Sequence, residues 1–207
     1  MNICMGNIIR TKIFMEKIYH NIWNKAILDS EIIQEMESAK HRDPGFDINY
    51  VDYYMHWSLL MYAVFWKRIE LIRYLLSDPD INVNHETSWG NTILHLLCNR
   101  GNMNSLLTLL LSRKDINVNI RNKYGYTGLH WAHYLGHEEC VKELLFDARV
   151  DIFAHNYCEK SIYAMIMDQH HDRIDNMLRM VQYTSLIRIP NKALQHDIVR
   201  MIIEEYA

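Results

Sequence analysis

Three histidines have the spacing that comes closest to metal chemistry in this sequence. His130, His133 and His137 stand at i, i+3 and i+7, which would place three imidazoles along one side of a helix. Neutral imidazole is a common zinc ligand, and a zinc ion with an open position activates water. Gly136, however, would end the helix between the second and third histidines. We therefore expect no metal site here.

The other residues that could carry catalysis stand in ordinary structural positions. Cys98 and Cys140 fall on predicted helices, where a small apolar side chain suits the core. The sequence contains no G-x-S-x-G, no Gly-rich phosphate loop, no H-E-x-x-H and no C-x-x-C. A metal-dependent or thiol enzyme would rest on these histidines and cysteines alone. We expect a protein that is not an enzyme and has no cofactor.

The elements that carry these residues repeat along the chain. The ten residues from Leu75 to Asn84 (LLSDPDINVN) return 35 positions later, from Leu110 to Asn119, as LLSRKDINVN. A second matching pair begins at Trp89 (WGNTILHLL) and at Tyr124 (YGYTGLHWA). Self-similarity at this period indicates stacked copies of one small unit, each burying its apolar face against its neighbours.

Each copy has the pattern of a tight turn followed by two helices. Gly90 and Gly125 stand where such a turn needs a positive φ. Thr92 and Thr127 suit the N-cap position, and a histidine three residues later lies one helical turn away. A second glycine ends the first helix, and leucines at helical spacing mark the second.

This pattern resembles the ankyrin repeat, whose signature is G-x-T-P-L-H-x-A, a G-H turn and a terminal Leu-Leu. The resemblance implies an all-α fold, an ankyrin-type α-solenoid of stacked helix-turn-helix repeats with hairpin-like loops. It also gives two of the histidines a structural role, because His130 matches T-P-L-H and His137 matches the G-H turn.

The resemblance covers about residues 20–180 and divides the chain into three parts. We expect an N-terminal extension at 1–16, an ankyrin repeat domain at 17–183 and a C-terminal helix at 184–207. Within the domain, a capping repeat at about 17–51 precedes repeats at about 52–86, 87–121, 122–155 and 156–183.

The first repeat and the cap are less regular than the two central copies. Met55 stands in place of the turn glycine, Trp57-Ser58-Leu59-Leu60 in place of T-P-L-H, and Trp66 in place of the inter-helix glycine. We therefore expect some local repacking. In the cap, Tyr19 to Lys40 has the pattern of a helix pair that breaks at Asp29-Ser30.

The C-terminal segment supports two interpretations. Leu194, Ile198 and Ile202 fall at i, i+4 and i+8, which predicts a capping helix. Leu186-Ile187-Arg188-Ile189-Pro190, followed by isoleucines, is instead similar to the F-box-like tail of some viral and intracellular-bacterial ankyrin proteins. That resemblance implies recruitment of a ubiquitin-ligase component through residues 186–207. Abundant Ile, Asn, Lys and Tyr hint at an AT-rich genome of such a source, and hence at a host protein as partner.

Composition limits the partner and the compartment. The formal net charge of -3 over 207 residues argues against non-specific nucleic-acid binding. No run approaches a membrane span, and the first twenty residues lack the apolar core of a signal peptide. The four cysteines lie far apart and suit a reducing compartment. We expect a cytoplasmic protein, or one in host cytoplasm or nucleus, that binds neither nucleic acid nor membrane.

The resemblance also implies where a protein partner would bind. Ankyrin proteins usually bind partners through their hairpin tips and the exposed side of the first helix. Aromatic residues recur at those positions here, and Tyr and Trp carry much of the binding energy in protein interfaces. Packing of these rings between neighbouring loops is the alternative use of the same residues. The candidate partner-binding residues are Tyr53, Tyr54, His56, Trp89, Asn91, Arg100, Lys123, Tyr124, Tyr126, Tyr134 and Tyr157.

On this interpretation the chain is a non-enzymatic module that binds a protein partner through the concave face and loop tips of an ankyrin stack. Two alternatives stay open. One is an adaptor that recruits ubiquitin-ligase machinery through its C-terminal helix. The other is an inhibitor of a transcription factor, similar to the ankyrin inhibitors that grip a basic partner.

Overall fold

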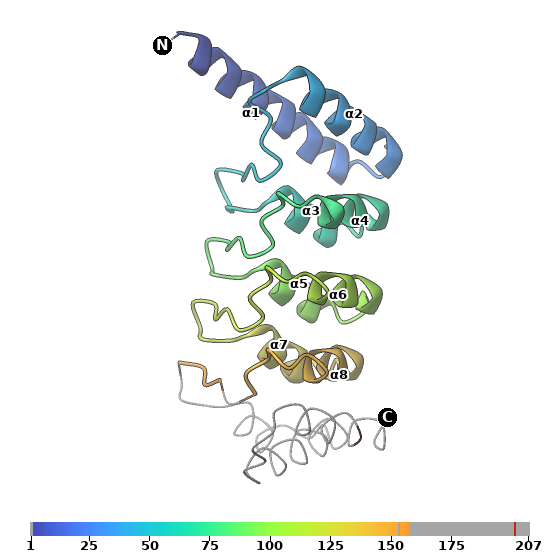
Figure 1. The fold of residues 1–207 in the computed structure, drawn as a ribbon, viewed down its shortest axis with the longest axis vertical. Helices are drawn as coiled ribbons and strands as arrows, with labels where there is room; N and C mark the ends of the chain where they lie inside the picture. Colours follow the sequence, from blue (N-terminus) through green and yellow to red (C-terminus); the bar gives the residue numbers. More distant parts are fainter. Residues whose placement is uncertain (1, 153, 158–200, 202–207) are drawn as a thin grey trace. The chain divides into compact units, whose positions relative to one another are not determined.

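The computed structural model describes residues 2–152, 154–157 and 201, and this part of the chain is helical (Figure 1). An isolated β-bridge joins Val51 to Ser58, and the described residues form no named strand. The predicted all-α fold of paired helices is confirmed. The helices are α1 (Asn2–Trp23), α2 (Asp29–Arg42), α3 (Leu59–Phe65), α4 (Ile69–Ser77), α5 (Ile93–Arg100), α6 (Asn104–Leu111), α7 (Gly128–Tyr134) and α8 (Glu138–Leu145).

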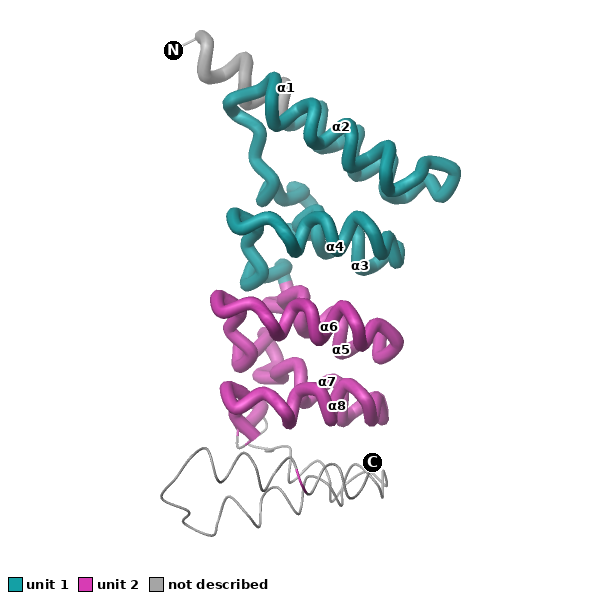
Figure 2. Tube along the Cα trace, turned by 45° about the vertical axis from the view of Figure 1, so that its right-hand side comes forward, with its two compact units in different colours: residues 1–88 teal, residues 89–207 magenta. Residues whose placement is uncertain are grey.

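The chain divides into two compact units, residues 1–88 and residues 89–207, which are coloured separately in Figure 2. In the first unit, α1 contacts α2 and α3, and α2 contacts α4. In the second unit, α5 contacts α6 and α7, and α8 contacts α6 and α7. Within each unit, therefore, one helix pair packs against the next.

Short helices of this kind depend on the apolar face that they bury. The α8 helix has eight residues and buries Cys140, Val141, Leu144 and Leu145, which lie on one side at helical spacing. A helix this short does not persist alone in water. Complete burial of a leucine or valine contributes about 1.5–3 kcal/mol, so packing supplies the stability that the isolated helix lacks.

The turn glycines adopt the backbone that the sequence predicted. Gly90 and Gly125 have φ values of 74° and 78°, in the left-handed region that side chains disfavour. At Gly125, a Cβ atom would also lie 2.5 Å from the backbone nitrogen of Tyr157. Conformation and close packing both require glycine there.

The first repeat is one residue longer in its hairpin than the prediction assumed. The Asp52 N–H donates to the Trp57 carbonyl at 3.0 Å and encloses four residues, whereas the matching bond from Asn122 N–H to the Tyr126 carbonyl, at 2.9 Å, encloses three. Because of the extra residue, the equivalent positions that follow lie one residue later in the sequence than the prediction placed them. Ser58, not Trp57, is the N-cap of α3, and the predicted placement of T-P-L-H on Trp57-Ser58-Leu59-Leu60 is wrong by one.

The same shift corrects the two positions that replace glycine. The prediction placed them at Met55 and Trp66. The left-handed residues are instead His56, with φ 53°, and Lys67, with φ 57°. Each is a side-chain-bearing residue in a conformation that glycine adopts at no steric cost.

The N-terminal helix also differs from its prediction. The α1 helix starts at Asn2 and runs through the predicted boundary between residues 16 and 17. The break lies at residues 24–28 rather than at Asp29-Ser30, because Asn24 forms the turn and its Oδ1 accepts the Ala26 N–H at 3.0 Å. Asp29 is the first residue of α2, where a carboxylate complements the helix dipole.

The C-terminal predictions fall outside the described residues. Of the repeat predicted at 156–183, only residues 156 and 157 are described, and of the helix predicted at 184–207, only residue 201.

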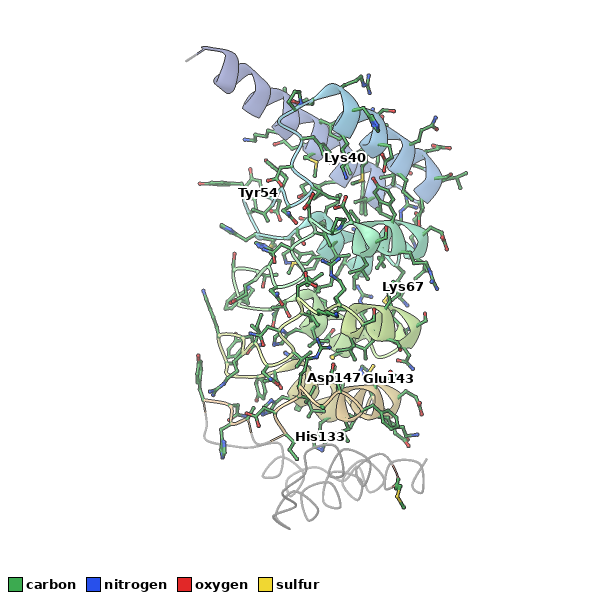
Figure 3. The ribbon with its side chains drawn as sticks, in the orientation of Figure 1. Lys40, Tyr54, Lys67, His133, Glu143 and Asp147 are labelled. Carbon is green, nitrogen blue, oxygen red and sulfur yellow. The ribbon has the colours of Figure 1, made fainter. Side chains whose placement is uncertain are left out.

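The register of the first repeat can be tested by restoring the missing glycine. Lys67→Gly should raise the free energy of unfolding by roughly 1 kcal/mol, because Lys67, labelled in Figure 3, holds a left-handed backbone. Urea unfolding followed by circular dichroism measures the change.

The matched control is Trp66→Gly, at the position that the uncorrected alignment would choose. Trp66 has φ -91° and its ring contacts Phe65 and Trp23, so this variant should be less stable than the parent. A lower free energy of unfolding in Lys67→Gly than in the parent would contradict the corrected register.

Candidate functional site

A histidine in the second unit fixes both the start of its own helix and the hairpin of the next repeat. The Thr92 N–H donates to His95 Nδ1 at 3.1 Å, and the Thr92 hydroxyl lies 2.9 Å from the same nitrogen. The other ring nitrogen, Nε2, donates to the Tyr126 carbonyl at 2.9 Å. Since Nδ1 accepts and Nε2 donates, the imidazole is neutral. Burial lowers the pKa of His95, which favours this state.

The same hydrogen bonds between a threonine and a histidine recur at the start of α7, in the next repeat. The Thr127 N–H donates to His130 Nδ1 at 3.1 Å, and the Thr127 hydroxyl lies 2.8 Å from it. Burial, assisted by the charge of Arg121, lowers the pKa of His130 to about 4. This histidine is therefore neutral at physiological pH, and its role at this position is structural.

The hairpin tip between these helices is organised by a buried asparagine. Asn122 Oδ1 accepts the N–H groups of Tyr124 and Tyr126 at 2.9 and 3.0 Å. The Asn122 side-chain amide donates to Asn91 Oδ1 at 2.8 Å, which ties this tip to the preceding one. Asn91, a predicted partner-binding residue, thus also has a structural contact.

Two exposed rings lie parallel at the tips of neighbouring repeats. Trp89 and Tyr124 have ring centroids 6.3 Å apart and an interplanar angle of 9°. The Lys123 N–H donates to the Trp89 carbonyl at 3.0 Å and holds the two tips together. Trp89 remains 57% exposed and Tyr124 53% exposed. The rings therefore pack against each other and still present a surface.

Tyr157 extends this row of rings. Its N–H donates to the Tyr124 carbonyl at 3.2 Å, and the guanidinium of Arg121 lies 5.2 Å from its ring centroid. Three predicted residues, Trp89, Tyr124 and Tyr157, are thus brought to successive hairpin tips of one unit, and Lys123 is exposed beside them.

Tyr126, which precedes α7, and Tyr134, the last residue of α7, line a hollow of about 280 Å³. The ring of Trp131 contacts both, with centroid distances of 5.9 Å to Tyr126 and 6.2 Å to Tyr134. Sequence reasoning did not select Trp131 as a binding residue. The available signal was its place directly after the T-P-L-H histidine, on the exposed side of the helix. The lining residues are Tyr124, Tyr126, His130, Trp131 and Tyr134.

In the first unit, the hairpin before α3 carries the most exposed rings. Tyr53 and Tyr54 are 82% and 86% exposed and contact each other edge to face at 5.6 Å (Tyr54 is labelled in Figure 3). The Asp52 carboxylate accepts the Tyr54 N–H at 2.9 Å and the Trp57 N–H at 2.7 Å, which holds the longer hairpin in shape. His56, also exposed, follows them in the left-handed conformation.

The corrected register reveals a second set of aromatic residues that the sequence alignment missed. Counted from the N-cap, positions -1, +4 and +7 are aromatic in the first and third repeats but not in the second. In the first repeat, the Trp57 ring lies 5.3 Å from both Tyr62 and Phe65. The residues at these positions are Trp57, Tyr62 and Phe65 in the first repeat, Asn91, Leu96 and Asn99 in the second, and Tyr126, Trp131 and Tyr134 in the third.

The remaining candidates have structural surroundings. Arg100 is the last residue of α5 and is half-buried. His137 Nδ1 donates to the Cys98 carbonyl at 2.8 Å, and a Cβ atom on Gly101 would lie 2.3 Å from its ring. His130 and His133 are buried. Across the part of the chain that the structure describes, no three His, Cys, Asp or Glu side chains form a group that could hold a metal.

The thiols are similarly placed in the core. Burial raises the pKa of Cys98 well above its usual value and that of Cys140 to about 11. The thiolate is the reactive form of cysteine, so neither thiol is activated for nucleophilic attack at neutral pH.

Comparison with known families agrees with this geometry. The family model described as ankyrin repeats (3 copies) matches residues 60–156. This stretch of the chain therefore consists of ankyrin repeats, which are protein–protein interaction modules and are usually non-catalytic. No curated protein matched the sequence. Among the described helices, none combines the length and apolar character needed to cross a bilayer.

The buried histidines predict a stability that depends on pH. His130 has a pKa of about 4 in the folded chain and about 6.5 in the unfolded chain. At pH values between these two, the unfolded state therefore binds more protons than the folded state. Stability is therefore full above about pH 6.5 and declines as the pH falls toward 4. The loss between pH 7 and pH 5 should be roughly 2 kcal/mol for this residue, with His95 acting in the same direction.

Urea unfolding at several pH values measures this loss. His130→Gln should flatten the dependence, whereas His155→Gln, which removes an exposed histidine of the same unit, should keep it. An unaltered slope in His130→Gln would contradict the assignment.

Proposed function

We propose that this chain binds a protein partner through its hairpin tips and the exposed side of its first helices, without catalysing a reaction. The observation that carries the proposal is the parallel pair Trp89 and Tyr124, more than half exposed at 57% and 53%. Rigid aromatic rings desolvate a large area on binding at little cost in side-chain entropy, which makes them effective interface anchors.

Other features of the tips support the same function. The side-chain oxygens of Asp52 and Asn122 accept backbone N–H groups of the tyrosine-bearing hairpins, so the surface is preorganised and little freedom is lost on binding. Lys123 and Arg121 add positive charge at the second unit's tips. That charge disfavours a basic partner of the kind gripped by ankyrin inhibitors of transcription factors.

Each unit has its own proposed binding residues. The first unit supplies Tyr53, Tyr54 and His56, and the second supplies Asn91, Arg100 and the residues around Trp89, Tyr124 and Tyr157. In the second unit, Lys123, Tyr126 and Tyr134 complete the proposed set.

A quantitative pull-down with the full chain as bait tests this function. The double variant Trp89→Ala plus Tyr124→Ala should lose a specific protein by at least tenfold, because two interface anchors are removed together. Trp23→Ala is the control, since it removes an indole of similar exposure (59%) from the end of α1 and should leave capture unchanged. Retention of every captured protein by the double variant would contradict the proposal.

A second candidate function rests on the sequence Leu186-Ile187-Arg188-Ile189-Pro190 and its F-box-like character. In that case the chain would link a bound protein, in a host cell, to ubiquitin-ligase machinery. Deleting residues 190–207 separates the two interpretations of this segment. The adaptor predicts lost ligase recruitment with unchanged stability, whereas a capping helix predicts a lower free energy of unfolding.

A further inference from the structure

The hollow beside α7 has aromatic walls. Trp131 and Tyr134 contact edge to face, with an interplanar angle of 87°, and Tyr126 lies at 49° to Trp131. Tyr124 and Tyr134 at the mouth are 53% and 50% exposed, while Tyr126 and Trp131 are half-buried. Rings arranged in this way enclose a side chain on several sides and leave one side open.

The floor of the hollow carries no charge. His130 is fully buried, and its Nδ1 is occupied by the Thr127 N–H and hydroxyl. With a pKa of about 4 it stays neutral at physiological pH. An uncharged floor under aromatic walls suits an apolar side chain, because a charged one would lose its hydration without gaining a partner.

Two basic residues precede the tyrosines of the hollow in the same hairpin. Lys123 precedes Tyr124 and is exposed, and Arg121 Nε donates to the Gly125 carbonyl at 3.3 Å, between the two tyrosines of the tip. Between Asp115 and Glu138 the sequence contains no carboxylate. Trimethylated lysine and similar cations, which aromatic cages can bind, would therefore meet repulsion here.

Three described carboxylates of the same unit have cations beside them. Asp115 pairs with Arg113 at 2.7 Å, on the loop after α6. Lys142 of α8 is 3.4 Å from Glu138 and 3.0 Å from Glu139. Each of these carboxylates therefore lies close to a cation of its own segment.

From this geometry we propose that the hollow binds one phenylalanine or leucine side chain of an acidic peptide segment in the partner. Carboxylates on either side of that residue would lie near Lys123 and Arg121. This inference rests on the proposed function and specifies the chemistry of the segment bound. The second repeat, with Asn91, Leu96 and Asn99 at the equivalent positions, has no such set of rings.

The test uses the full chain and a blocked, fluorescein-labelled peptide of sequence Glu-Asp-Glu-Phe-Glu-Asp-Glu. Fluorescence anisotropy measures its affinity, and the NMR signal of the Trp131 indole N–H, assigned with Trp131→Phe, reports whether it enters the hollow. We expect saturable binding with a shift of that signal. A peptide with alanine in place of phenylalanine should bind at least tenfold more weakly, and one with lysines in place of the acids should not bind.

Variants of the chain separate the basic residues from the walls. Lys123→Glu and Tyr134→Ala should each weaken binding at least tenfold. Lys114→Glu makes the same charge reversal at an exposed residue that does not line the hollow, and should leave the affinity unchanged. Circular dichroism confirms that each variant is folded.

Several results would overturn the inference. Equal affinity for the phenylalanine and alanine peptides would exclude an apolar anchor, and unchanged binding by Lys123→Glu would exclude the contribution of Lys123. A Trp131 indole that is shielded from acrylamide in the free chain would mean that the chain itself fills the hollow. Loss of partner capture in the Trp89→Ala and Tyr124→Ala double variant, with no peptide binding, would reject this inference and keep the proposed function. Peptide binding by a chain that captures no partner would keep this inference and reject the proposed function.

Discussion

The hydrogen bonds of one imidazole hold together the parts of the second unit that form its exposed surface. His95 accepts the Thr92 N–H at one ring nitrogen and donates to the Tyr126 carbonyl with the other, at 3.1 and 2.9 Å. The first bond caps a helix too short to persist by itself. The second fixes the hairpin of the next repeat, and with it a wall of the aromatic hollow. A structural histidine thereby determines where the proposed binding residues stand, although it need not contact a ligand.

The central repeats could be predicted from the sequence because each structural requirement there selects a particular residue type. A left-handed turn selects glycine at positions 90 and 125, and a helix start selects threonine at 92 and 127. The first repeat starts its helix with Ser58, another common N-cap, but its left-handed residues are His56 and Lys67, which have no such signature. Its hairpin also has one additional residue, so a fixed offset of 35 misplaced the N-cap and both left-handed residues by one position.

The candidate site could be predicted only where exposure follows from the fold. Tips project from any ankyrin repeat, so Trp89, Tyr124 and Tyr157 were found from their positions, and all three are exposed. Trp131 was missed because the motif leaves its position free, and only its contacts with Tyr126 and Tyr134 give it a role. The aromatic set of the first repeat was hidden by the shift of one residue. Packing between side chains, rather than residue type, decides which rings lie together at the surface.

The protonation state of His95 tests the central claim most directly. Two-bond ¹H–¹⁵N NMR of the histidine side chains distinguishes the neutral tautomers from the imidazolium. At pH 7 this account predicts a neutral His95 with its proton on Nε2, exchanging slowly with solvent because that proton is bonded to the Tyr126 carbonyl. A proton on Nδ1, or an Nε2 proton that exchanges as fast as that of an exposed histidine, would contradict it.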